Sequence, residues 1–412
     1  MFNKVCQTLL MATSPHAIPY KSPTHWIRYN SSEVFQNLVD AKASILSLKA
    51  IPHQRDWVET LQEIQLKMEV AGTSRIEGAE FTDRELDEAL NPRQRATDLL
   101  TRSQRQARAA AETYRWIAKV PDDYPISGDF VCDVHRRMVV GCDDDHCPPG
   151  RIRGRDENVT FGFPRHRGCD GGESCHTAFS ALIKALQTEY KGHDPLIQAM
   201  ALHYHFAAMH PFLDGNGRTA RALEALILQR AGLRDTAFIA MSNYYYEEKP
   251  AYLGVLADVR SINHDLTPFI NFALRGVAIQ CERLFREIKH HIQVAVFRNM
   301  MYDLFHHLES PRKRVIAERQ IEMLKLLLAH QQIDSNELIK QTRRTYSKLK
   351  NGNKALVRDI NALISLGAVH ASRSDKSWSF VINLDWPEQI TETDFMERVR
   401  QMPKGKMHTF LS

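Results

Sequence analysis

Two strongly apolar segments with helical spacing, separated by one short polar loop, are the feature that most constrains this chain. Leu196–Met209 carries apolar side chains three and four positions apart, and Pro195 precedes it at a position that suits the first turn of a helix. Arg218–Arg230 is equally apolar, and Gly232 follows it where a helix commonly ends. We therefore expect two helices that are joined directly by the loop between them.

The connecting loop gathers side chains that suit phosphate chemistry. Residues 210–221 read His-Pro-Phe-Leu-Asp-Gly-Asn-Gly-Arg-Thr-Ala-Arg. The Asp-Gly-Asn-Gly part is a turn sequence, and glycines before a helix expose backbone N–H groups that bind anions. Arg218 and Arg221 share a helix face, and two guanidinium groups there suit a polyphosphate. Asp214 suits Mg²⁺, and His210 can accept a proton at neutral pH.

Together these groups predict phosphoryl or nucleotidyl transfer, in which positioning and charge stabilisation supply most of the catalysis. The loop lacks the GxxxxGK[ST] pattern, so it is no Walker A site. The alternative is an ordinary surface turn between two helices. That alternative fits Gly215-Asn216-Gly217 alone, but not a histidine, an aspartate and two arginines that converge on one turn.

The loop resembles the Fic family signature HPFx[DE]GNGRxxR at every specified position. The resemblance implies a mainly α fold, a Fic-type helical bundle with a β-hairpin flap. It also implies transfer of AMP from ATP to a Ser, Thr or Tyr hydroxyl of a protein, with release of pyrophosphate. His210 is then the general base, and Asp214 holds Mg²⁺. The residues implied to bind ATP are Phe212, Gly215, Asn216, Gly217, Arg218, Arg221, Tyr244 and Tyr252.

A second motif follows the helical pattern Trp57–Met68. By itself, Glu77 is most simply a solvated charge near a helix end. Fic proteins with an N-terminal inhibitory helix carry [ST]xxxE[GN], however, and Thr73, Glu77 and Gly78 match it. The resemblance implies that Glu77 pairs with Arg221 and occupies the site of the γ-phosphate. In some relatives the same glutamate supports removal of AMP, and this alternative stays open.

Residues 142–175 are rich in glycine and proline, which predicts an irregular loop with a hairpin. In Fic proteins a hairpin beside the loop clamps the target as an added strand. The alternative is a long surface loop. The residues expected to form the flap are Asn158, Val159, Thr160, Phe161 and Gly162.

The same segment contains cysteines and histidines that suggest a zinc site. They are Cys142, His146, Cys147, His166, Cys169, Cys175 and His176, and their spacings match no familiar ligand set. We therefore expect reduced thiols, since the chain has 7 cysteines and no CxxC pair. No apolar run approaches the roughly 18 residues that span a bilayer. These features predict a cytoplasmic protein without membrane contact.

Positive charge is concentrated near the C-terminus. Residues 312–384 hold fourteen Lys and Arg but six Asp and Glu, whereas the whole chain has a net charge of only +5. Three helical patterns and two strand-like runs in this segment predict a winged helix-turn-helix. Five basic residues precede or open its third helix, the recognition position for DNA: Arg343, Arg344, Lys348, Lys350 and Lys354. DNA is therefore one partner to consider, with dimerisation or target docking as the alternative.

The expected organisation has five parts. They are an N-terminal helical region with the inhibitory helix (1–110), a catalytic core (111–290), a connecting helix or linker (291–311), the winged helix (312–384) and a tail (385–412). Thr82 and Glu85 predict a capping box that starts a helix in the first part. The expected protein partner is a hydroxyl-bearing substrate, for which the chain itself is one candidate, and a homo-oligomer stays open. The rival interpretation is a DNA-binding transcriptional regulator with a silent or sensory Fic domain.

Overall fold

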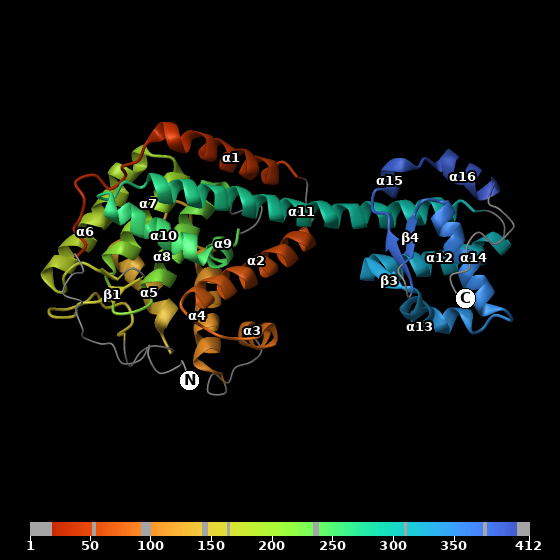
Figure 1. Ribbon diagram of the computed structural model, residues 1–412, viewed down its shortest axis with the longest axis horizontal. Coiled ribbons are helices and arrows are strands. Elements are labelled where there is room, and N and C mark those ends of the chain that lie inside the picture. Colours follow the sequence, from red (N-terminus) through yellow and green to blue (C-terminus); the bar gives the residue numbers. More distant parts are fainter. Residues whose placement is uncertain are drawn as a thin grey trace. The chain divides into compact units, whose positions relative to one another are not determined.

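The computed structural model describes residues 19–51, 55–91, 100–141, 147–162, 165–233, 239–308, 311–373 and 377–401, with the backbone alone for 55–58 and 311–314. The chain divides into two compact units, Met1–Phe285 and Arg286–Ser412 (Figure 1). The division falls inside one long helix, α11 (Thr267–His306).

The first unit is built almost entirely from helices, which confirms the expected mainly α fold. Its helices are α1 (Ser31–Lys49), α2 (Arg55–Ile76), α3 (Asp83–Leu90), α4 (Arg102–Ile117), α5 (Gly128–Val139), α6 (Glu173–Gln187), α7 (Pro195–Met209), α8 (Asn216–Leu228), α9 (Met241–Glu247), α10 (Lys249–Ser261) and the start of α11.

Helices α7 and α8 pack along each other in the core of this unit. Nearly every side chain of both helices is buried, including Met200, Phe206 and Leu226. Both helices are apolar around most of their circumference, as expected for helices that contact protein on all sides. The loop between them is consequently held at both ends by rigid, buried elements.

Helix α2 is longer than its apolar pattern predicts. It continues to Ile76, so Thr73 lies in its last turn, and the expectation that this motif follows the helix is wrong. Thr82 and Glu85 form the predicted capping box at the start of α3, with both reciprocal hydrogen bonds present. Helix α2 packs against α4 and α9.

The glycine-rich segment forms a short antiparallel hairpin. Strand β1 (Thr160–Phe161) pairs with β2 (His166–Arg167), so that Phe161 lies opposite His166. The strand is shorter than the expected run from Asn158, because Asn158 and Val159 precede the ladder. Cys142 and His146, two of the considered zinc ligands, lie outside the described residues.

The second unit combines helices with a small sheet. Its elements are α12 (Pro311–His330), β3 (Gln332–Asp334), α13 (Ser335–Tyr346), α14 (Gly352–Ser365), β4 (Val369–Arg373), β5 (Trp378–Ile382), α15 (Trp386–Gln389) and α16 (Glu392–Gln401). The antiparallel sheet has the order β3-β5-β4. Strand β3 was not predicted, because three residues are too few to show an alternating pattern. Residue 311, expected at a linker, is instead the first residue of α12.

The core of the second unit lies between the sheet and its helices, where Leu327, Leu363 and Phe380 are buried. The helices described in the two units include none that is both apolar enough and long enough to traverse a lipid bilayer.

Candidate active site

His210 ends α7 in a left-handed conformation, with φ 55° and ψ 60°. This backbone turn directs the chain into the loop, and Nδ1 of the imidazole lies 2.9 Å from the carbonyl oxygen of Ala207. Because a carbonyl oxygen only accepts, Nδ1 carries the proton and Nε2 is the basic atom. Burial lowers the pKa of His210 to about 4. The imidazole is therefore neutral at pH 7 and can accept a proton.

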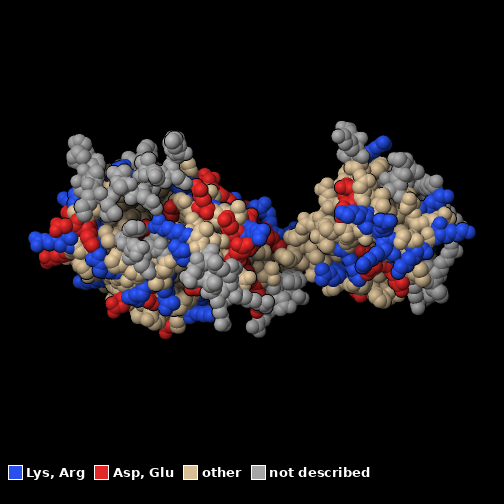
Figure 2. Space-filling model, turned by 90° about the horizontal axis from the view of Figure 1, so that it is seen from below, with Lys and Arg blue, Asp and Glu red and all other residues tan. Residues whose placement is uncertain are grey.

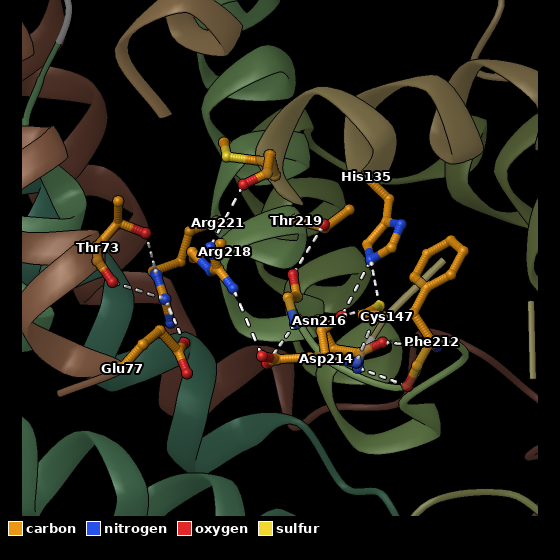
Figure 3. A network of polar contacts seen from close by, with 12 residues as sticks. Thr73, Glu77, His135, Cys147, Phe212, Asp214, Asn216, Arg218, Thr219 and Arg221 are labelled. Carbon is orange, nitrogen blue, oxygen red and sulfur yellow. Dashed lines mark hydrogen bonds and ion pairs between the residues drawn. The ribbon is translucent and has the colours of Figure 1, made fainter. Parts of the chain in front are cut away.

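The loop after His210 is closed by the side chain of Asn216. Its amide accepts a hydrogen bond from the Phe212 N–H and donates one to the Phe212 carbonyl, both at 2.9 Å (Figure 3). Gly215 has φ 73°, and a Cβ there would lie 2.5 Å from a methyl group of Val139. The side chain of Asn216 thus shapes the loop, and its backbone begins α8.

The start of helix α8 lies at the loop and carries no side-chain cap. Its N-cap, Gly215, has no side chain, and no side-chain hydrogen bond caps the helix. The first N–H groups of a helix bind anions readily because the helix dipole adds partial positive charge there. This end of α8 is therefore suited to phosphate.

Asp214 presents a carboxylate to the same place. One oxygen accepts from the Gly215 N–H at 2.6 Å, and the other lies 3.8 Å from Nη2 of Arg218. The side chain is 48% exposed and lines the cavity described below. Mg²⁺ usually binds one or two carboxylates together with substrate phosphates and water, so this single half-exposed carboxylate fits it. Within the described ranges, no group of three His, Cys, Asp or Glu side chains is placed to hold a metal by itself.

Arg221 on α8 contacts Glu77, which lies in the turn directly after α2. Nη2 lies 2.6 Å from Oε1 of Glu77, while Nε donates to Oγ1 of Thr73 at 2.9 Å (Figure 3). Partial desolvation opposes ionisation of Glu77, but the Arg221 guanidinium outweighs it and holds the pKa of the carboxyl below its usual value. A Cβ on Gly217 would lie 2.3 Å from Oε1 of Glu77, so only glycine leaves room for this pair.

A cavity of about 720 Å³ brings three of the predicted groups together. From the loop and α8 it is lined by His210, Asp214, Asn216, Gly217 and Arg221, from the flap by 158–162, and from the turn after α2 by Glu77. Tyr252, one of the two tyrosines predicted to bind ATP, also lines it, and so does Lys249, which was not predicted. Lys249 donates from Nζ to the Ile76 carbonyl at 2.8 Å, and nothing in its sequence neighbourhood signals this.

Several predicted residues lie outside the lining of this cavity. Phe212 is fully buried and stacks on the ring of His135, with centroids 3.7 Å apart. Tyr244 packs against the Phe272 ring instead, and Arg218 is 2% exposed beneath the loop. Gly78 has φ 89° and ends the turn after α2. These four residues lie near the cavity but are not among the residues that line it.

The flap covers the histidine. The ring of Phe161 stacks on the imidazole of His210 with centroids 3.9 Å apart and planes 8° apart. Because β1 carries Phe161, the position of the flap determines how an incoming group reaches Nε2 of His210. The predicted flap and the predicted base are therefore parts of one site.

His135 supports the loop from α5, although it was not among the residues predicted from the sequence. The Gly150 N–H donates to Nδ1 of His135 at 2.9 Å, so Nε2 is protonated and donates to the Asp214 carbonyl at 3.0 Å. A histidine in an apolar helix pattern gives no signal of such a contact. Through these two bonds, His135 links the carbonyl of Asp214 to Gly150, which lies in the segment that leads into the flap.

Three buried thiols support the same loop backbone. Cys169 donates to the Met209 carbonyl at 3.3 Å, Cys175 to Pro211 at 3.7 Å and Cys147 to Asp214 at 3.6 Å. All three are free cysteines. They were considered for zinc in the sequence analysis, and in the structure their sulfur atoms contact loop carbonyls.

Parts of this chain are similar in sequence to known proteins. Residues 125–228 match the model of the Fic/DOC family. Protein adenylyltransferase fic-1 of Caenorhabditis briggsae is 33% identical over 171 residues, 41% of this chain and 30% of that protein. Protein adenylyltransferase Fic of Nematostella vectensis is 32% identical over 154 residues, 36% of this chain and 32% of the relative. The chain thus matches less than a third of the length of either relative.

Two solved structures are also similar. Fic-1 (residues 134–508) from C. elegans has a TM-score of 0.53 and 20% identity, over 63% of this chain and 74% of that one. A Fic family protein from Desulfovibrio desulfuricans has a TM-score of 0.55 and 17% identity, over 88% of this chain and 98% of that one. At these identities the likeness shows that the chain has the Fic fold.

Proposed function

We propose that this chain, which carries a Fic domain over residues 125–228, transfers AMP from ATP to a hydroxyl side chain of a protein and releases pyrophosphate. The observation that carries the proposal is the composition of one cavity. A neutral histidine, a half-exposed aspartate, the N-terminus of α8 and the guanidinium of Arg221 meet on its walls. These groups suit a base, a magnesium ligand and two phosphate sites, respectively.

The reaction follows from the position of His210. Nε2 accepts the proton of the target hydroxyl while the hydroxyl oxygen attacks the α-phosphorus of ATP. A bond forms between that oxygen and phosphorus, the bond from phosphorus to the bridging oxygen breaks, and pyrophosphate leaves. Mg²⁺, held by Asp214 and the phosphates, would neutralise part of the negative charge. The target segment would pair with β1 as an added strand, which places its hydroxyl near His210.

The resting protein is proposed to be inhibited by Glu77. Its carboxylate already occupies the guanidinium that would bind the γ-phosphate. Inhibition is then a competition between a carboxylate and a phosphate for Arg221. Thr73 also competes with the phosphate, since its hydroxyl and carbonyl oxygens both accept hydrogen bonds from Arg221.

The test uses the Glu77→Gly protein with ATP, Mg²⁺ and cell lysate. We expect proteins whose mass increases by one AMP, and none with Glu77→Gly combined with His210→Ala. If the doubly substituted protein labels the same proteins at the same rate, His210 is not the base. If neither protein transfers AMP to any lysate protein or to itself, the proposed activity is wrong.

A DNA-binding regulator is the second candidate, favoured by the charge of the second unit. Figure 2 shows Lys and Arg side chains gathered on one face of it, and Lys340, Arg343 and Lys354 line a groove between α13 and α14. The order of helices and strands supports a winged helix with α14 in the recognition position. Filter binding across a salt titration tests this, because phosphate contacts make affinity fall steeply with salt. DNA binding without AMP transfer by Glu77→Gly would favour the regulator.

Removal of AMP is the third candidate, since Glu77 lines the cavity beside Arg221. This candidate would be identified if a modified protein loses its AMP in the presence of the chain and keeps it when Glu77 is replaced.

The five described cysteines that are free thiols support a reducing compartment, and we propose the cytoplasm.

A further inference from the structure

We propose that Arg153 is the positioning residue that holds the general base and the flap in one fixed relationship. The proposal rests on the proposed AMP transfer, in which His210 is the base. Arg153 does not line the cavity, so it would act through the backbone that it holds.

The guanidinium of Arg153 binds three separate segments of the chain. Nε donates to the His210 carbonyl at 2.8 Å, Nη1 to the Glu157 carbonyl at 2.6 Å, and Nη2 to the Cys169 carbonyl at 2.6 Å. The backbone N–H of Arg153 also donates to the Pro211 carbonyl at 3.0 Å. A planar fork with five donors in fixed directions suits such a junction, and a lysine cannot reproduce it.

The guanidinium donates to carbonyl oxygens and to the sulfur of Cys169, although the side chain is fully buried. The nearby carboxylate of Glu157 pairs with Arg151 instead, at 2.6 Å. Glu157 acts on Arg153 through its charge, but the hydrogen bonds of the guanidinium go to neutral acceptors. Because a buried cation loses its hydration, this arrangement gains little net stability. We infer that its three short hydrogen bonds fix the positions of the backbone segments that they bind.

One of the three bonds determines the conformation of the base. His210 has φ 55°, a value that costs energy for any residue except glycine. In this conformation its carbonyl points to Nε of Arg153, while its imidazole lies in the cavity. The Arg153 bond and the Ala207 bond therefore hold the backbone and the ring of the histidine from two sides.

The other two bonds hold both ends of the flap. Glu157 immediately precedes the flap residues 158–162, and Cys169 follows β2. Gly168 lies at the same junction, where a Cβ would approach the Met209 carbonyl to 2.8 Å, His210 Cβ to 3.0 Å and Nη2 of Arg153 to 3.1 Å. The strand that would receive the target and the base that would deprotonate it are thus both attached to one guanidinium.

The test compares three variants in the Glu77→Gly protein: Arg153→Lys, Gly168→Ala and the control Gly192→Ala, whose Cβ would meet nothing within 4 Å. Labelled AMP incorporation at saturating ATP gives the transfer rate, and calorimetry gives the Kd of MgATP. We expect Arg153→Lys to lower the rate by at least about thirtyfold and Gly168→Ala by at least about tenfold. The Kd of MgATP should change less than about threefold in both, because Arg153 contacts no cavity-lining side chain that would bind phosphate. Gly192→Ala should match its parent in both measurements.

An Arg153→Lys rate within about threefold of the parent would overturn the proposal. Equal losses of rate and MgATP affinity in both Arg153→Lys and Gly168→Ala would overturn it too, because they indicate general damage. If Arg153→Lys does not fold, Gly168→Ala decides by the same criteria.

A second readout does not need activity. In ¹⁵N-histidine spectra, with His210 assigned by His210→Ala, the parent should show the neutral Nδ1–H form, and Arg153→Lys should shift these signals. Unchanged His210 signals would count against the proposal. Absence of AMP transfer by the parent would refute the proposed function instead and leave the spectra to decide on Arg153.

Discussion

Oε1 of Glu77 lies 2.6 Å from Nη2 of Arg221, although the two residues are 144 positions apart in the chain. The last turn of α2 thereby covers the first turns of α8, the place where the proposed function puts the end of the ATP triphosphate. Arg221 is 2% exposed and Glu77 is 34% exposed, so a solvent-accessible carboxylate neutralises a buried cation. Whatever displaces the end of α2 therefore also exposes the guanidinium that is proposed to bind phosphate.

Glu77→Gly should therefore raise AMP transfer. We expect an increase of at least about tenfold, equivalent to ~1.4 kcal/mol, because the phosphate no longer competes with a tethered carboxylate. Without ATP the variant should be less stable by about 1 kcal/mol, a modest value because Glu77 is partly exposed and screened. Labelled AMP incorporation and thermal unfolding measure the two effects. The control is Glu80→Gly, an exposed glutamate three positions later, which should leave both unchanged.

Gly72→Ala should also activate, without touching Glu77. A Cβ on Gly72 would lie 2.4 Å from the backbone of Ser242, so α2 and α9 must separate. Overpacking of this kind costs about 1–3 kcal/mol and should move the last turn of α2 away from Arg221. Gly254→Ala in α10, where a Cβ meets nothing within 4 Å, is the matched control. A lower melting temperature with no gain in AMP transfer would show that the two contacts are independent.

The pH dependence of transfer should report His210. Burial lowers its pKa to about 4, so the imidazole is already neutral at neutral pH. The rate of the Glu77→Gly protein should not depend on this group between about pH 6 and 8, and should fall only as pH approaches 4. Because of the same shift, His210 binds a proton more tightly in the unfolded chain than in the folded protein. The free energy of unfolding should therefore also decline as pH falls from 6.5 toward 4. A rate profile with an acid limb near 6.5 would contradict the buried setting.

Glu69 should make stability fall as pH rises. It is buried on α2, where it accepts from the Ser242 N–H at 2.7 Å and from the Tyr114 hydroxyl at 2.8 Å. Burial raises its pKa to about 7, against the opposing hydrogen bonds from Ser242. The folded state therefore binds this proton more tightly than the unfolded state does. The stability that proton binding to Glu69 contributes is lost as pH rises from 4.5 through 7, by up to about 3 kcal/mol.

Denaturant unfolding at several pH values measures this dependence, which Glu69→Gln should remove. Glu63→Gln is the control on the same helix, because Glu63 is 67% exposed and pairs with Arg115 at the surface. An identical pH dependence in wild type and Glu69→Gln would show that another group is responsible.

Local patterns predicted the parts of the site that lie close together in the chain. The helices around His210, the turn at Gly215 and the capping box at Thr82 follow from side-chain period, positive-φ residues and short hydrogen bonds. Each of these depends on residues no more than about one helical turn apart. The strand β3 was not predicted, because it is too short to show an alternating pattern and is defined by its pairing with β5, nearly fifty positions away.

The supports of the site could not be predicted in the same way. His135, Arg153 and Lys249 each donate to carbonyls of distant segments, and a backbone carbonyl is present at every position. No side-chain pattern therefore distinguishes the carbonyl that is bound. The tyrosines show the same limit: Tyr252 faces the cavity and Tyr244 packs on Phe272, a choice made by the packing of α9 and α10.

The sequence by itself determined which chemistry the loop from His210 to Arg221 can perform, because identity and spacing decide which groups share a turn. The meeting of Arg221 with Glu77, the protonated nitrogen and lowered pKa of His210, and the attachment of the flap were decided only by the tertiary structure. The physical reason is that conformation within a turn depends on short-range sterics and hydrogen bonds, whereas burial, pairing and proton affinity depend on groups that the fold brings from far along the chain.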